Sequence, residues 1–167
     1  LSLMEKNFVQ AEQFLTLIAA DSPATAKLRR EAGLMFYAQY LQEKNSAGEE
    51  AESTQQLRQQ ALSILQSAVA ATGSAAGDDV ETAGAAPDTS RFDAANSLAR
   101  LLLADGQYDS AEAVLISGDQ APLKLLSLGN SNLPPRVMME SYRTAIQLKI
   151  ALLAEDRLPA NQSYSKQ

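Results

Sequence analysis

Cysteine, histidine and tryptophan are all missing from the 167 residues of this chain. Their absence excludes disulfides, zinc sites built on thiolates or imidazoles, and the Cys or Ser–His nucleophiles of hydrolases. Aromatic residues make up only 5 % of the chain, which is little for a β-sheet, because strands favour aromatic and β-branched residues. Alanine and leucine dominate instead, and both favour helices, so the composition predicts an all-α fold.

Basic residues are fewer than acidic ones. The chain has 14 Lys and Arg against 20 Asp and Glu, a net charge of −6. A negative field repels phosphate backbones and anionic lipids, so we expect no nucleic-acid partner. We also expect no membrane span, because no run approaches the ~20 apolar residues that one requires. No targeting segment is found, and the compartment stays open between cytoplasm and periplasm.

Motifs for catalysis and for cofactors are scarce. The acid pairs Glu49-Glu50 and Asp78-Asp79 fall in polar stretches, without the apolar surroundings that raise a carboxyl pKa for acid–base work. No glycine run continues into the Lys-Ser/Thr of a phosphate loop, and Asp78-Asp79-Val80-Glu81 is too short for a calcium loop. We therefore expect a protein that is not an enzyme and holds no metal or cofactor. An enzyme would require a cluster of buried carboxylates.

The chain does contain a series of amphipathic stretches. Apolar residues recur at three- and four-residue steps and predict helices at about 4–20, 24–44, 50–71, 90–105, 108–116 and 134–156, with one or two further turns within 120–128. Residues 72–88 are small, glycine-rich and acidic, without Lys or Arg, and predict a flexible acidic loop.

Individual residues add local predictions. Gly33 lies inside a predicted helix, where glycine costs roughly 1 kcal/mol relative to alanine, so we expect it to pack closely against a neighbouring helix. Ser90 is the predicted N-cap of its helix, and Gly106 suits the left-handed position after a helix end. Leu28, Ala32, Met35, Phe36 and Tyr40 are expected to share one apolar face, and Met138-Met139 is expected in the core.

Apolar residues on the last predicted helix cover more than one narrow stripe. They are Val137, Met138, Met139, Tyr142, Ile146, Ile150 and Leu153. A helix of this kind is either packed between neighbours or lies against something outside this chain. The first residue is Leu1 rather than Met, which indicates a piece of a longer protein.

Two of these helices form a hairpin pattern between Ala95 and Leu115. They meet at Asp105-Gly106-Gln107, and each carries one face of large and small apolar residues: Leu98, Ala99 and Leu102 on the first, Tyr108, Ala111 and Leu115 on the second. This order resembles the tetratricopeptide repeat family. The resemblance implies a right-handed α–α superhelix of stacked antiparallel helix pairs, here with about six helices. Another family of α–α superhelix is the alternative.

The resemblance divides a single domain, residues 1–167, into five parts. These are the second half of a repeat (8–23), a stretched repeat (26–72), the flexible acidic loop (72–88), the clearest repeat (90–118) and a C-terminal capping helix (133–157).

The function implied by this family is a non-catalytic scaffold that binds a protein or peptide, here within a larger bacterial protein. The first helix of each pair lines the concave face, which assigns peptide binding to Lys27, Arg30, Leu34, Tyr37, Asn96 and Arg100, with Asp93 on the same face. Lys27, Arg30, Asn96 and Arg100 supply the residue types, though not the full order, of the family's clamp for a C-terminal carboxylate.

Two alternatives stay open. The basic residues are also typical of an exposed helix face that pairs with acids such as Glu31. The second alternative is that the whole domain is a structural spacer or cap that packs against other domains of the same chain or assembly, with its groove filled by its own loop. The ligand and the oligomeric state are left open.

Overall fold

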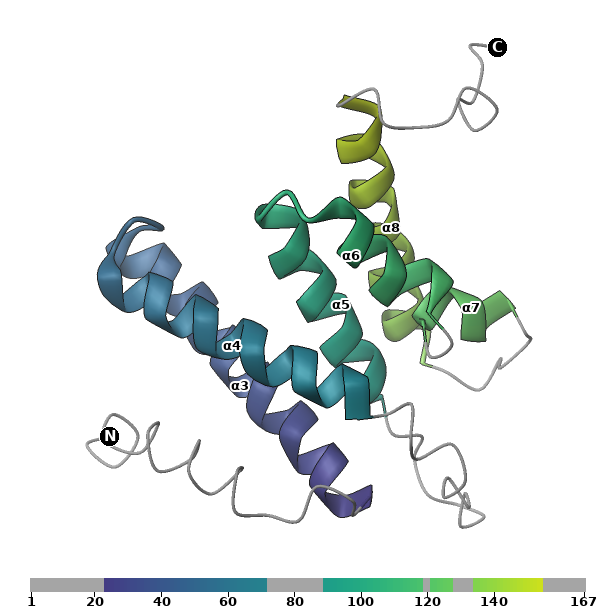
Figure 1. The fold of residues 1–167 in the computed structure, drawn as a ribbon, viewed down its shortest axis with the longest axis horizontal. Coiled ribbons are helices and arrows are strands. Elements are labelled where there is room, and N and C mark those ends of the chain that lie inside the picture. The colour runs from purple at the N-terminus through teal and green to yellow at the C-terminus, as the bar shows by residue number, and fades with distance from the viewer. Residues whose placement is uncertain (1–22, 72–88, 119–120, 128–133, 155–167) are drawn as a thin grey trace.

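The computed structural model describes residues 23–71, 89–118, 121–127 and 134–154 (Figure 1). All elements of this part are helical: α3 (Pro23–Ala47), α4 (Glu52–Ala71), α5 (Ser90–Ala104), α6 (Tyr108–Glu112), its π-helical continuation η1 (Ala113–Ser117), α7 (Pro122–Ser127) and α8 (Pro135–Ala154). The predicted all-α class is thus confirmed for these residues. None of the described helices is long and apolar enough to cross a membrane. The helix predicted at 4–20 and the acidic loop predicted at 72–88 lie outside the described ranges.

Helices α3 and α4 form a long antiparallel hairpin (Figure 1). Gly48 turns the chain with a φ of 91°, and its carbonyl accepts a hydrogen bond from Thr54 Oγ1 at 2.8 Å. Gly33 lies where the two helices meet: a Cβ placed on it would stand 2.7 Å from Leu65 Cδ2. The close packing predicted for Gly33 is therefore confirmed.

Helices α5 and α6 form the second hairpin. Gly106 adopts a φ of 69°, as predicted for the left-handed position, and Ala99 and Ala111 are fully buried. The prediction for Ser90 was wrong, because Thr89 occupies the N-cap position, without a side-chain cap hydrogen bond. The Ser90 hydroxyl instead accepts a hydrogen bond from Arg30 Nε of α3, at 2.9 Å.

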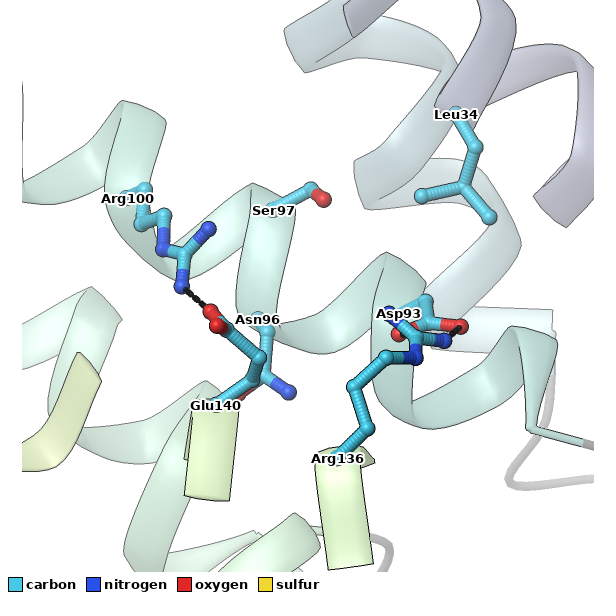
Figure 2. Close-up of a pocket in the computed structure, with 7 residues that line it drawn as sticks. All are labelled: Leu34, Asp93, Asn96, Ser97, Arg100, Arg136 and Glu140. Carbon is cyan, nitrogen blue, oxygen red and sulfur yellow. Dashed lines mark hydrogen bonds and ion pairs between the residues drawn. The ribbon is translucent and has the colours of Figure 1, made fainter. Parts of the chain in front are cut away.

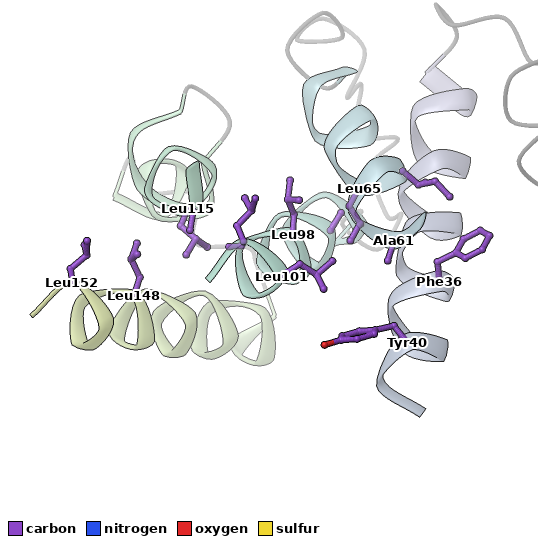
Figure 3. Packing of buried hydrophobic residues seen from close by; sticks show 14 residues of the cluster. Phe36, Tyr40, Ala61, Leu65, Leu98, Leu101, Leu115, Leu148 and Leu152 are labelled. Atoms are coloured by element: carbon purple, nitrogen blue, oxygen red, sulfur yellow. The ribbon is translucent and has the colours of Figure 1, made fainter. Parts of the chain in front are cut away.

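Helix α5 occupies the centre of the described part. It contacts α3 and α4 on one side and α8 on the other, while α8 also contacts α6 (Figure 1). Fourteen buried residues from the α3–α4 hairpin, from α5 to η1 and from α8 form one continuous core. Leu148 and Leu152 of α8 point toward the rest of this core (Figure 3). A second cluster joins Phe92 and Val137, with Leu125, Leu126 and Met138 packed against it.

The apolar face predicted for α3 is partly wrong. Leu28 is 44 % and Met35 57 % exposed. The buried face of α3 runs instead through Ala26, Arg30, Gly33, Phe36 and Tyr40. Since this buried face contains an arginine and a glycine, it is less apolar than the neighbouring face, and hydrophobic periodicity favoured the neighbouring face. Met139, predicted in the core, is 71 % exposed, since α8 packs against the other described helices through its opposite face.

Candidate functional site

A pocket of about 400 Å³ lies where α3, α5 and α8 come together (Figure 2). Its lining residues come from all three helices: Leu34 from α3, Asp93, Asn96, Ser97 and Arg100 from α5, and Arg136 and Glu140 from α8. The α5 residues recur at three- and four-residue steps and therefore share one face of that helix. Six of the seven lining residues are polar or charged, and four of these six come from α5.

Two ion pairs join α5 and α8 across the pocket (Figure 2). Arg136 Nη2 lies 3.1 Å from Asp93 Oδ2, and Arg100 Nη2 pairs with Glu140 Oε2. Arg100 Nε also donates a hydrogen bond to Thr144 Oγ1, at 3.2 Å. Because partners follow the same order along both helices, α5 and α8 run in the same direction. The four charges balance, so the pocket carries no net charge from these groups.

Asn96 is the most deeply placed polar residue of the pocket, with 3 % of its surface exposed. Its Nδ2 donates to Ser141 Oγ at 3.0 Å, and the Ser141 hydroxyl donates to the carbonyl of Val137 at 3.0 Å. Since the hydroxyl hydrogen of Ser141 is already used, the Asn96 nitrogen rather than its oxygen must face it. The Asn96 Oδ1 is buried and lacks a hydrogen-bond partner among the described residues. Leaving such an acceptor unsatisfied costs about 1–3 kcal/mol.

Arg100 connects the three helices of the site. It lies beside the hydroxyl of Tyr37 from α3 as well as beside Glu140 from α8. Burial raises the pKa of the Tyr37 hydroxyl, and the positive charge of Arg100 acts against this rise. The Arg100 guanidinium also lowers the pKa of Glu140, chiefly through its hydrogen bond to the carboxylate, while desolvation opposes the shift.

Three of the six residues predicted to bind a peptide line this pocket: Leu34, Asn96 and Arg100. Tyr37 adjoins the pocket through Arg100. Lys27 is exposed on α3 and is not part of the lining, and Arg30 is only 8 % exposed, with its Nε bonded to Ser90. The four residues of the predicted carboxylate clamp therefore do not converge on this pocket, because Arg30 holds α3 to the start of α5 instead.

Three lining residues were not predicted on the binding face: Ser97, Arg136 and Glu140. Asp93 was predicted on that face, though not as a binding residue, and it also lines the pocket. The sequence does carry a signal for the charged ones. Asp93 and Arg100 on α5 have the charge order opposite to that of Arg136 and Glu140 on α8. This complementary charge order predicts the two ion pairs only once the two helices are known to lie side by side in the same direction.

Comparison of the chain with family models, with curated protein sequences and with solved structures finds no match. The resemblance to tetratricopeptide repeats therefore rests on the residues of this chain alone, and it stays a prediction.

The lowered pKa of Glu140 predicts a pH-dependent contribution to stability. Because its pKa is lower in the folded chain than the usual 4.5, the stabilisation by Arg100 is present above that value and is lost as pH falls through the folded pKa. Glu140→Gln should lower the free energy of unfolding by about 1 kcal/mol or less at pH 7, since its side chain is about one third exposed to screening solvent.

Urea unfolding across this pH range tests the prediction. The difference between wild type and Glu140→Gln should shrink as pH falls below 4.5 and should vanish once the carboxyl is protonated in both the folded and the unfolded chain. Glu31→Gln, at an exposed position on α3, is the control and should change stability by less than about 0.5 kcal/mol at any pH. A Glu140→Gln difference that persists unchanged at the acid end would contradict a role for the ionised carboxylate.

Proposed function

We propose that this chain is a non-catalytic helical-repeat scaffold that binds an extended peptide, or an extended segment of a protein, on the face shared by α3, α5 and α8. The packing order supports the repeat arrangement: α8 lies against α5 and α6 as α5 lies against α3 and α4. The right-handed superhelix implied by the resemblance is part of this proposal. In such an array, the first helices of successive pairs line one continuous face.

The observation that carries the proposal is that Asn96, a residue of the pocket lining, has a buried Oδ1 without a hydrogen-bond partner among the described residues. A peptide main chain offers N–H donors at regular intervals, and one of them would satisfy this acceptor. The pocket volume falls within the ~300–1,000 Å³ typical of ligand sites. The residues around Asn96 offer both donors and acceptors, as a main chain requires.

The charges of the pocket favour a main chain over a free carboxylate. Arg100 and Arg136 are each already paired with an acid. An incoming carboxylate would have to displace Glu140 or Asp93, leaving an acid without its partner. A neutral amide backbone can bind Asn96 without breaking either pair. This distinguishes the proposed mode from the carboxylate clamp that the sequence suggested.

A random peptide library displayed on phage tests the proposal. We expect enriched peptides that, once synthesised, bind the wild-type chain with a Kd of about 1–100 μM in fluorescence anisotropy. Asn96→Ala should weaken binding at least about tenfold, because it removes the proposed acceptor. Amidation of the peptide C-terminus should leave the Kd within about threefold, since no free carboxylate is required.

The same substitution at two arginines gives a test variant and its matched control. Arg100→Gln alters the pocket and should weaken binding, whereas Arg143→Gln, on the exposed surface of α8 outside the lining, should not. Circular dichroism melting would confirm that each variant is folded. The proposal fails when no peptide is enriched, or when Asn96→Ala and Arg143→Gln affect binding equally.

The structural spacer is the second candidate, and the exposed apolar side of α8 favours it. A spacer would show no peptide enrichment while still associating through α8. The Asn96→Ala variant separates the two functions, because a peptide bound to the exposed apolar side of α8 would bind this variant as it binds the wild type, whereas a peptide in the pocket would not.

A further inference from the structure

Helix α8 presents a continuous apolar stripe to solvent. Its members are Met139, Tyr142, Ile146, Ile150 and Leu153, which are 71 %, 54 %, 59 %, 61 % and 50 % exposed. At about 100° per residue they fall within roughly 80° of the helix circumference and extend for about 21 Å along it. The opposite side of α8, with Val137, Leu148 and Leu152, is buried against the other helices. The stripe, called here the α8 stripe, is thus a second apolar face on one helix.

The spacing of the α8 stripe is symmetric about Ile146. Successive members are three, four, four and three residues apart. In an antiparallel pair of α8 helices, Met139 would face Leu153 of the other copy, Tyr142 would face Ile150, and Ile146 would face itself. A two-fold interface has this property, because residue i contacts j and j contacts i. The symmetry of the spacing therefore fits a second copy of the same chain.

The size of the α8 stripe also fits a dimer. Taking a fully exposed side chain of this size as about 200 Å², the five residues expose roughly 600 Å², at the upper end of the largest patches on monomers. Two copies together would bury about 1,200 Å², which reaches the lower limit of stable interfaces.

The charges beside the α8 stripe allow this pairing. Arg143 flanks one side and lies near Glu140, while Lys149 flanks the other and pairs with Glu112 at 3.3 Å. In the antiparallel pair, each of these cations would be offset from its copy by six residues, about 9 Å along the axis. That separation is close to the Debye length of about 8–10 Å, so salt screens their repulsion.

We propose that a second copy of this chain docks antiparallel on the α8 stripe, with the two-fold axis at Ile146. The interface and the candidate pocket use different sides of α8, since Arg136 and Glu140 lie about 80–120° around the helix from Ile146. The dimer is therefore independent of the proposed peptide binding, and either can fail without the other.

Sedimentation equilibrium of the 167-residue chain tests the oligomeric state. At about 100 μM we expect twice the 17.9 kDa of one chain. Ile146→Glu would bring two carboxylates together at the two-fold axis and should weaken the dimer more than about 100-fold. Gln147→Glu adds the same charge one residue away, off the stripe, and should change the dimer Kd by less than about threefold. Circular dichroism checks that both variants stay helical.

Disulfide trapping tests the direction of the helices without relying on Ile146→Glu, because the chain has no native cysteine. Ile146→Cys should form a covalent dimer under mild oxidation. Met139→Cys should not, but a mixture of Met139→Cys chains with Leu153→Cys chains should. Met35→Cys, exposed on α3, is the control for random collision and should form no covalent dimer.

Each remaining outcome overturns the proposal. A dimer that survives Ile146→Glu uses another surface, and covalent Met139→Cys dimers without the mixed pair indicate parallel helices. A wild-type monomer leaves the stripe to another occupant. Faster hydrogen exchange in α8 after deletion of residues 155–167 assigns the stripe to that segment, and unchanged exchange leaves it to a different protein.

Discussion

Replacing Phe92 by alanine is expected to lower the free energy of unfolding by about 3–5 kcal/mol. Phe92 is 1 % exposed and packs with Val137, which is fully buried, and with Leu125, Leu126 and Met138. This cluster joins the start of α5 to α7 and to the start of α8. The truncation would remove the largest buried side chain of the cluster and leave a cavity that three separate helices cannot easily close. Since a domain is stable by only about 5–15 kcal/mol, the loss is a large fraction of the total.

Urea unfolding followed by circular dichroism measures this loss. Met35→Ala is the control, because it removes a large apolar side chain that is 57 % exposed and should cost less than about 1 kcal/mol. Phe92→Ala should also increase hydrogen exchange at the start of α8 more than in α4. Equal losses in the two variants would mean that the Phe92 cluster does not hold α7 and α8 to α5.

Leu65→Ala is expected to cost about 2–5 kcal/mol and to reverse the effect of Gly33→Ala. In the wild type, a methyl on Gly33 would stand 2.7 Å from Leu65 Cδ2 and 2.9 Å from its Cγ. Overpacking of this kind costs about 1–3 kcal/mol, more than the roughly 1 kcal/mol that alanine gains over glycine in a helix. Gly33→Ala should therefore destabilise the wild type by about 1 kcal/mol but stabilise the Leu65→Ala variant by about as much.

A double-mutant cycle at Gly33 and Leu65 measures this coupling, expected at about 2 kcal/mol. Leu28→Ala, which removes the same side chain from a position 44 % exposed on α3, serves as the control background. There Gly33→Ala should destabilise as it does in the wild type. A coupling below about 0.5 kcal/mol would show that Leu65 shifts away at little cost, and that the α3–α4 contact is less tight than the structure indicates.

The candidate pocket differs from a preformed anion site because its cations are already neutralised. Arg100 pairs with Glu140 and also donates to Thr144, and Arg136 pairs with Asp93. These contacts hold α5 and α8 together, so an anionic ligand would compete with the packing of the domain itself. Asn96 is different, since its nitrogen maintains the contact with Ser141 while its oxygen has no partner among the described residues. A ligand that donates to this oxygen would add a hydrogen bond without removing one.

Local structure was predictable wherever neighbouring residues decide it. The helix ranges followed from apolar residues at three- and four-residue steps, and the described helices have nearly the predicted bounds. Gly106 was predicted in the left-handed region because a helix ends there, and it has a φ of 69°. Gly33 indicated a close helix contact because its cost within a helix requires a compensating gain. In α4, Ala61, Ile64 and Leu65 are among the apolar residues at three- and four-residue steps, and all three are buried.

The face of each helix that becomes buried was less predictable where polar residues lie in it. Arg30 was assigned to a binding surface, yet it is 8 % exposed and holds Ser90 of α5. The position of Arg30 in the helical pattern cannot distinguish these roles, because burial of the Arg30 guanidinium depends on Ser90, sixty residues away in sequence. Met35 and Met139 were assigned to the core by their apolarity alone, and both are exposed.

The sequence by itself thus determined the approximate bounds of the helices and the roles of Gly33 and Gly106, because these depend on interactions within a few residues. Only the tertiary structure decided how the helices combine. It placed Asp93 and Arg100 beside Arg136 and Glu140, left Asn96 Oδ1 without a partner in the described residues, and turned the α8 stripe to solvent. Each of these outcomes depends on which helices are neighbours, since charge pairing and burial are set by contacts between residues far apart in the chain.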